Sequence, residues 1–146
     1  MSRVDFYILP DVDTRASWRF ACRLAGKALE KGLRVHVHLD DDAAADDLDA
    51  LMWEYPPEQF LPHARVGRPD AGVAPVTIDN RPTAPESAFD GLLINLSRHI
   101  PDWSGHFARV AEIVTAPDRD LGRQRYRHYR GEGHHLEHHT LDDWEA

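Results

Sequence analysis

Short runs of apolar, β-branched and aromatic residues alternate along the chain with longer segments in which apolar residues recur every three or four positions. The short runs are typical of β-strands, and the periodic segments are typical of amphipathic helices. Leu33–Leu39, for example, alternates apolar residues with Arg34, His36 and His38, which predicts a strand with one partly exposed polar face. The pattern predicts strands over Val4–Leu9, Leu33–Leu39, Val73–Ile78, Gly91–Leu96 and Val110–Val114.

The periodic segments begin and end at residues that commonly stand at helix ends. Asp13 or Thr14 can cap a first helix, which Lys31 and Gly32 would end. Three further helices are expected, from Asp42 to near Trp53, from Pro101 to about Arg109, and from Asp118 to Arg130. Because strands alternate with helices, the sequence predicts an α/β layer fold with a largely parallel central sheet.

The length of 146 residues fits one domain with one core. We expect a single α/β domain over residues 1–133, with a proline-rich loop between Pro56 and Ser87. Residues 134–146 contain four histidines and a closing acidic cluster, so we expect a poorly ordered tail there.

The chain has one cysteine, Cys22, which stands among apolar residues of the first predicted helix. A single thiol cannot form an intramolecular disulfide, so it is expected to be a packed side chain in a reducing compartment, the cytoplasm. The apolar runs fall far short of the roughly 20 residues that span a bilayer. We therefore expect no membrane contact, and the early acidic residue Asp5 argues against a secretory signal.

The net charge of −8 argues against direct, strong nucleic-acid binding, because an acidic protein repels the phosphate backbone. The segment from Arg119 to Arg130 departs from this balance, since it holds five arginines and one acidic residue. A basic patch on an acidic body indicates a site for a small anionic partner, such as an acidic peptide or a phosphate.

On a helix, Arg119, Arg123, Tyr126 and Arg130 fall on one stripe within roughly 60°, with Arg127 at its margin and Arg125 pointing elsewhere. Such a stripe can bind carboxylates, and it can equally be an ordinary solvated face. The sequence leaves a similar choice for Trp53 and Phe60, which flank the Pro56-Pro57 turn: they are either core residues or an exposed partner site.

The residues after the first predicted strand allow two enzymatic interpretations, a dinucleotide-binding enzyme and a phosphatase. The first strand is followed by Pro10-Asp11-Val12-Asp13-Thr14, which lacks the glycines of a dinucleotide-binding loop. The same Asp11 and Asp13 resemble the nucleophile motif of Mg²⁺-dependent haloacid-dehalogenase-type phosphatases, which is the alternative function. That family also needs a downstream lysine, whereas both lysines of this chain, Lys27 and Lys31, lie in the first predicted helix; helix capping is the simpler role for Asp13.

The histidine-rich tail raises the question of a metal site. His134/His138 and His135/His139 stand four residues apart, a spacing that could chelate Zn²⁺ or Ni²⁺ if the segment were helical. However, Gly131-Glu132-Gly133 precedes it and no cysteine is nearby, so we expect neither a specific metal nor another cofactor.

Four blocks of sequence, in order, resemble the chi subunit family of the bacterial DNA polymerase III holoenzyme. They are Phe6-Tyr7-Ile8-Leu9; Leu51-Met52-Trp53 followed by Pro57-Glu58-Gln59-Phe60-Leu61-Pro62-His63; Gly72-Val73-Ala74-Pro75-Val76-Thr77-Ile78; and Arg123-Gln124-Arg125-Tyr126-Arg127-His128-Tyr129-Arg130.

The resemblance implies a non-catalytic accessory protein of DNA replication with a Rossmann-like three-layer fold. It implies binding to the acidic C-terminal tail of single-stranded-DNA-binding protein through Arg123, Tyr126 and Arg127, with Arg119 and Val114 nearby. It also implies that Trp53 and Phe60 contact the psi subunit of the clamp loader or a repair helicase. Arg127 replaces the usual lysine, which keeps the charge and permits a bidentate contact.

Overall fold

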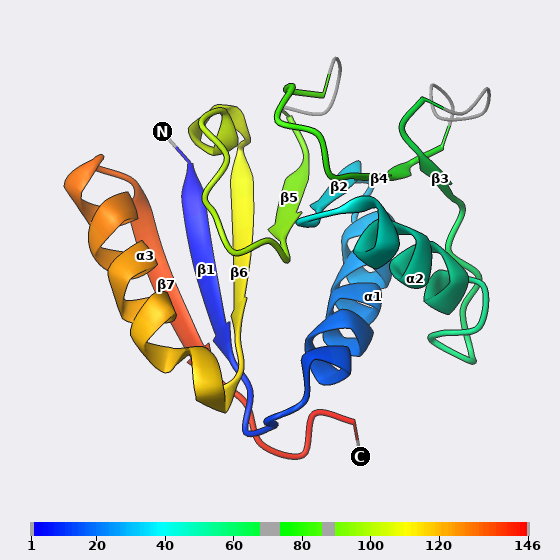
Figure 1. Ribbon diagram of the computed structural model, residues 1–146, viewed down its shortest axis with the longest axis horizontal. Coiled ribbons are helices and arrows are strands. Elements are labelled where there is room, and N and C mark those ends of the chain that lie inside the picture. The colour runs from blue at the N-terminus through cyan, green and yellow to red at the C-terminus, as the bar shows by residue number, and fades with distance from the viewer. Residues whose placement is uncertain (1, 68–73, 86–89, 146) are drawn as a thin grey trace.

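The structure, a computed structural model, describes residues 2–67, 74–85 and 90–145. In these residues one seven-stranded sheet has every pairing parallel, in the order β3-β4-β2-β5-β6-β1-β7 (Figure 1). The strands are β1 (Arg3–Ile8), β2 (Val35–His38), β3 (His63–Arg65), β4 (Val76–Asp79), β5 (Leu92–Asn95), β6 (Arg109–Val114) and β7 (His135–Thr140). The prediction of a largely parallel sheet is confirmed, although Val73, the first residue of one expected strand, lies outside the described residues.

Helices cover both faces of the sheet, which gives the three layers of a Rossmann-like α/β fold (Figure 1). α1 (Thr14–Glu30) and α2 (Asp42–Met52) pack on one face, and α3 (Arg119–Gly131) packs on the other. Two short 3-10 helices, η1 (Ser104–His106) and η2 (Ala116–Asp118), complete the set. None of the helices in the described ranges has the length and apolar composition that crossing a bilayer requires.

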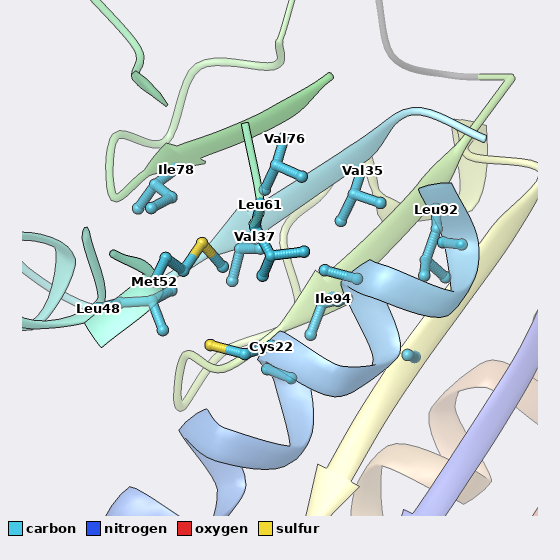
Figure 2. Close-up of a cluster of buried hydrophobic side chains, with 14 of the residues drawn as sticks. Cys22, Val35, Val37, Leu48, Met52, Leu61, Val76, Ile78, Leu92 and Ile94 are labelled. Carbon is cyan, nitrogen blue, oxygen red and sulfur yellow. The ribbon is translucent and has the colours of Figure 1, made fainter. Parts of the chain in front are cut away.

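The sheet separates two apolar cores because successive residues of a strand point to opposite faces. In β5, Leu92 and Ile94 pack against α1, whereas Leu93 packs on the α3 side. Figure 2 shows the first core, in which the Cys22 thiol lies buried among strand and helix side chains. The expectation of a packed cysteine is confirmed, and its burial raises the pKa of Cys22 to about 12.

The predicted start of the first helix is also confirmed. Asp13 is the N-cap of α1, and its Oδ1 accepts a hydrogen bond from the backbone N–H of Arg15 at 3.0 Å. The helix ends at Glu30, and Gly32 follows with φ of 78°, a left-handed conformation that glycine adopts without strain.

The helix expected between Pro101 and Arg109 does not form, and only the 3-10 turn η1 occurs there. Trp103 and Phe107 flank this turn and are both buried in the second core. Phe107 has extended backbone angles, φ −73° and ψ 145°, so the 3-10 helix ends at His106 after a single turn. Packing of two large rings therefore outweighs the helix-start signal of Pro101.

The prediction of a poorly ordered tail from residue 134 is wrong for most of that segment. His135–Thr140 forms β7, which pairs in parallel with β1 along its whole length, from Arg3↔His135 to Ile8↔Thr140. β7 is the outermost strand at this end of the sheet, and its Leu136 packs against the second core. Backbone pairing, rather than side-chain hydrophobicity, orders the segment.

His36 and His38 are buried, not partly exposed as their alternation suggested. Their rings lie against Trp103, at centroid distances of 5.8 Å and 5.3 Å. Alternation of apolar and polar residues indicates an exposed face only where no other element packs on that face. Parallel sheets are normally covered on both faces, so the polar face of this strand is buried as well. Burial lowers the pKa of His36 to about 4 and also lowers the pKa of His38.

Candidate functional site: a cationic groove beside Tyr126

A surface groove of about 380 Å³ lies between α3 and the strands β1, β6 and β7. It brings together four of the five residues predicted for tail binding, namely Val114, Arg119, Arg123 and Tyr126. The remaining lining residues are Phe6, Ile8, Gly122, His138 and Thr140. Arg127 is exposed on α3 but is not part of the lining.

The floor of the groove is apolar. Phe6 and Val114 are buried, and the Phe6 and Tyr126 rings are 5.4 Å apart. Gly122 lets α3 approach β6 closely, since a Cβ at this position would lie 3.0 Å from a methyl group of Val114. An apolar side chain of a ligand can therefore be covered on several sides.

The rim of the groove is cationic. Arg123 forms an ion pair with Asp120 at 2.7 Å, in which both side chains are exposed. Exposed pairs of this kind contribute little, about 0–1 kcal/mol, so a ligand carboxylate can replace Asp120. Arg119, Arg127 and Arg130 form no ion pair within the part of the chain that the structure describes. Of these, Arg119 lines the groove and is available to an anionic partner, whereas Arg127 and Arg130 lie on α3 outside the lining.

A buried polar network fixes α3 on the sheet behind the groove. The Glu112 carboxylate, which is fully buried, accepts hydrogen bonds from Arg125 Nη1 (2.6 Å), Asn95 Nδ2 (2.9 Å) and Tyr129 Oη (2.8 Å). Arg125 Nη2 donates to the carbonyl of Ser97 at 2.6 Å. The prediction that Arg125 points away from the stripe is confirmed, and its inward position directs Arg119, Arg123 and Tyr126 outward.

Trp53 and Phe60 form a second exposed feature. Their side chains are 62% and 64% exposed, and their ring centroids are 5.9 Å apart. The sequence left open whether these aromatics belong to the core, and the structure places them on the surface. The two rings together form an exposed apolar patch.

Asp11 and Asp13 have structural partners. Asp13 caps α1, and the Asp11 carboxylate accepts a hydrogen bond from Trp144 Nε1 at 2.8 Å. Both carboxylates of the phosphatase-like motif therefore have structural hydrogen-bonding roles.

Of the histidines considered for metal binding, His135, His138 and His139 lie on β7 and His134 directly precedes it, so the helical chelate does not form. Residues four apart in a strand are separated by about 13 Å, too far to ligate one ion together. Among the described residues, no group of three or more His, Cys, Asp or Glu side chains could hold a metal. His139 instead donates to the buried Asp5 at 3.0 Å.

Several lining residues escaped the sequence prediction. Phe6 and Ile8 share one face of β1, and strand alternation was the signal that could have found them. His138 and Thr140 were assigned to the tail, and nothing local reveals that their segment pairs with a strand about 130 residues earlier.

Comparisons with known proteins agree with this description. Residues 1–137 match the family described as DNA polymerase III chi subunit, HolC. Three relatives are each named DNA polymerase III subunit chi. The protein of Pseudomonas aeruginosa is 38% identical over 143 residues, covering 97% of this chain and 98% of the relative. Those of Escherichia coli and Haemophilus influenzae are 33% and 31% identical, covering 93% and 90% of this chain and 96% and 92% of the relatives.

The fold and the groove define the class of protein: a Rossmann-like α/β domain that lacks the nucleotide-binding glycine loop after its first strand and carries a cationic surface groove. The chain belongs to the DNA polymerase III chi subunit family. It is therefore an accessory member of a replicative polymerase complex, and the phosphatase alternative is wrong.

Proposed function

We propose that the chain links the clamp loader of DNA polymerase III to single-stranded-DNA-binding protein, by holding that protein's acidic C-terminal tail in the groove beside Tyr126. The observation that carries the proposal is the combination of an apolar floor with cationic side chains on the rim. Arg119 and Arg123 would bind carboxylates, Arg127 would extend the cationic surface, and Val114 and Tyr126 would cover the last side chain of the tail. This role puts the protein in the cytoplasm.

The physical chemistry favours a peptide over DNA. The net charge of −8 repels phosphate backbones, so contact with the template is better made through a protein that coats it. Charge-assisted hydrogen bonds to arginine contribute about 1.5–3 kcal/mol each. Because the cations are exposed, binding should weaken as salt is added.

Replacing Arg123 with alanine tests the groove directly. We expect Arg123→Ala to cost about 2 kcal/mol of affinity for a tail peptide, roughly a 30-fold increase in Kd. The side chain is 67% exposed, so the fold should be unchanged. Isothermal titration calorimetry measures the affinity, and circular dichroism checks the fold.

Arg130→Ala is the matched control, because Arg130 is exposed on the same helix and carries the same charge but does not line the groove. Its effect should be well below that of Arg123→Ala. Equal affinity of Arg123→Ala and the unmodified protein would contradict the proposal, as would equal binding of a tail peptide that lacks its terminal apolar residue.

We further propose that the exposed Trp53–Phe60 pair contacts the psi subunit of the clamp loader, or a repair helicase that competes for it. Trp53→Ala should reduce the affinity for psi at least tenfold, because large aromatics at interfaces commonly contribute 2 kcal/mol or more. A pull-down with psi measures the loss, and binding of the acidic tail peptide should stay unchanged. Undiminished psi binding would assign the pair to another partner.

A further inference from the structure

A second basic feature lies on α1, on the face of the sheet opposite to the groove of α3. Cations occur at every fourth position of this helix: Arg15, Arg19, Arg23, Lys27 and Lys31, the last directly at its C-cap. Residues four apart are neighbours on a helix and are offset by about 40°, so these side chains form a continuous ridge.

Two cations in the middle of the ridge, Arg19 and Arg23, are neutralised within the molecule. Glu145 makes two contacts with Arg19, at 2.8 Å and 3.1 Å, and Glu58 pairs with Arg23 at 2.8 Å. Next to Glu145, the Trp144 ring stands edge-on to Phe20 at 5.3 Å. The chain's own acidic C-terminal segment thus binds α1 through an aromatic ring and an adjacent carboxylate.

The C-terminal half of the ridge is open. Lys27 and Lys31, the only lysines in the sequence, are exposed and pair with no carboxylate in residues 2–67, 74–85 and 90–145. They line a groove of about 380 Å³ between α1 and the strands β1, β6 and β7. Its apolar lining includes Phe20, Leu24 and Leu33, and Trp144 also contacts it.

This groove and the groove of α3 lie on opposite faces of the sheet, so they are separate binding sites. Successive strand residues point to opposite faces, so Tyr7 and His139 line the α1 groove whereas Phe6 and His138 line the α3 groove. The Asp5 carboxylate, buried in the sheet, already pairs with Arg109 at 3.1 Å and with His139 at 3.0 Å. Among the described cations that line this groove, Lys27 and Lys31 are therefore the two without a carboxylate partner.

We infer that the α1 groove binds an acidic peptide segment of a partner protein that carries one large apolar side chain between carboxylates. The apolar side chain would enter beside Phe20, Leu24 and Leu33, and the carboxylates would pair with Lys27 and Lys31. The chemistry is that of the Trp144–Glu145 contact, repeated two helical turns further along α1. This inference does not depend on the proposed function of the α3 groove.

The two lysines permit a direct test. Reductive ¹³C-methylation labels only Lys27, Lys31 and the N-terminus, and it keeps their positive charge. The probe is a capped synthetic peptide containing Asp-Asp-Trp-Glu, titrated into the full chain and followed by NMR. We expect both lysine signals to shift in a saturable manner, with smaller shifts for a peptide in which Gly replaces Trp and for one in which Asn and Gln replace the acids.

Affinity is measured in parallel by fluorescence anisotropy of the labelled peptide. Lys27→Glu/Lys31→Glu should weaken binding at least tenfold, and Lys27→Arg/Lys31→Arg should retain it. Arg123→Ala, in the other groove, should leave it unchanged, which separates this site from the proposed function. Absence of saturation, equal response to the Trp-free peptide, or loss of binding in Arg123→Ala would each overturn the inference. So would a dimer that dissociates when residues 141–146 are removed, because a second copy would then be the occupant.

Discussion

Replacing Arg125 with methionine should destabilise the protein by about 3–5 kcal/mol, because the change leaves the Glu112 carboxylate buried without its cation. Both side chains are almost fully buried, at 8% and 1% exposure, and their nearest atoms are 2.6 Å apart. Methionine fills a similar space, so the loss reports the uncompensated charge rather than a cavity. Urea unfolding at neutral pH measures the difference in free energy.

A double variant separates the pair from its surroundings. In Arg125→Met/Glu112→Gln the buried charge is removed together with its partner, so much of the lost stability should return. Asn95 and Tyr129 still have an amide oxygen to donate to. Arg127→Ala, a change on the same helix at an exposed position, should alter stability by less than about 0.5 kcal/mol. A loss below 1 kcal/mol in Arg125→Met would show that this ion pair does not hold α3 in place.

The sequence predicts the part of the site that lies on one helix. The helical repeat separates Arg125 from Arg119, Arg123 and Tyr126, and the structure has the same division between the buried and exposed sides of α3. Local spacing suffices there because neighbouring turns of one helix determine which side chains share a face.

The other wall of the groove comes from strand pairing, which local spacing does not reveal. β7 is ordered by parallel pairing with β1, and its sequence, His135–Thr140, has no apolar alternation of the usual kind. Similarly, β3 spans only three residues and is formed by its pairing with β4. Elements of this kind depend on backbone hydrogen bonds to distant segments, so the sequence did not predict them.

Burial of charge and of imidazole is also a tertiary property. Glu112 lies in a strand whose other residues gave a clear apolar signal. Two of its three donors, Arg125 and Tyr129, come from α3, and the third, Asn95, comes from the neighbouring strand β5. His36 and His38 alternate with valines in the sequence. Their side of the sheet is buried because the rings of Trp103 and Phe107 pack against it. The same covering has a consequence for stability that depends on pH.

Acidification from pH 7 to pH 4.5 should destabilise the protein by about 2–3 kcal/mol through His36, which is buried as a neutral ring. Its pKa is lowered from 6.5 to about 4 in the folded state, first by burial and then by the neighbouring His38. Between pH 6.5 and pH 4, His36 is protonated in the unfolded chain but remains neutral in the folded protein. The contribution of neutral His36 to stability is therefore complete above pH 6.5 and is lost as the pH falls towards 4. The full difference corresponds to about 3 kcal/mol.

Urea unfolding at intervals between pH 7.5 and 4.5 measures this slope, and His36→Gln removes the titrating group while retaining a hydrogen-bonding side chain for Thr77. The variant should be less stable at pH 7.5 and should lose less stability on acidification. Asp5 does not interfere in this window. Burial raises the pKa of Asp5, but hydrogen bonds from His139, Arg3 and Arg109 outweigh burial and hold it below 3.8, so its contribution is lost only at lower pH. An unchanged slope in His36→Gln would mean that the ring gains a proton without leaving the core, and that the burial of His36 does not set the acid sensitivity of the fold.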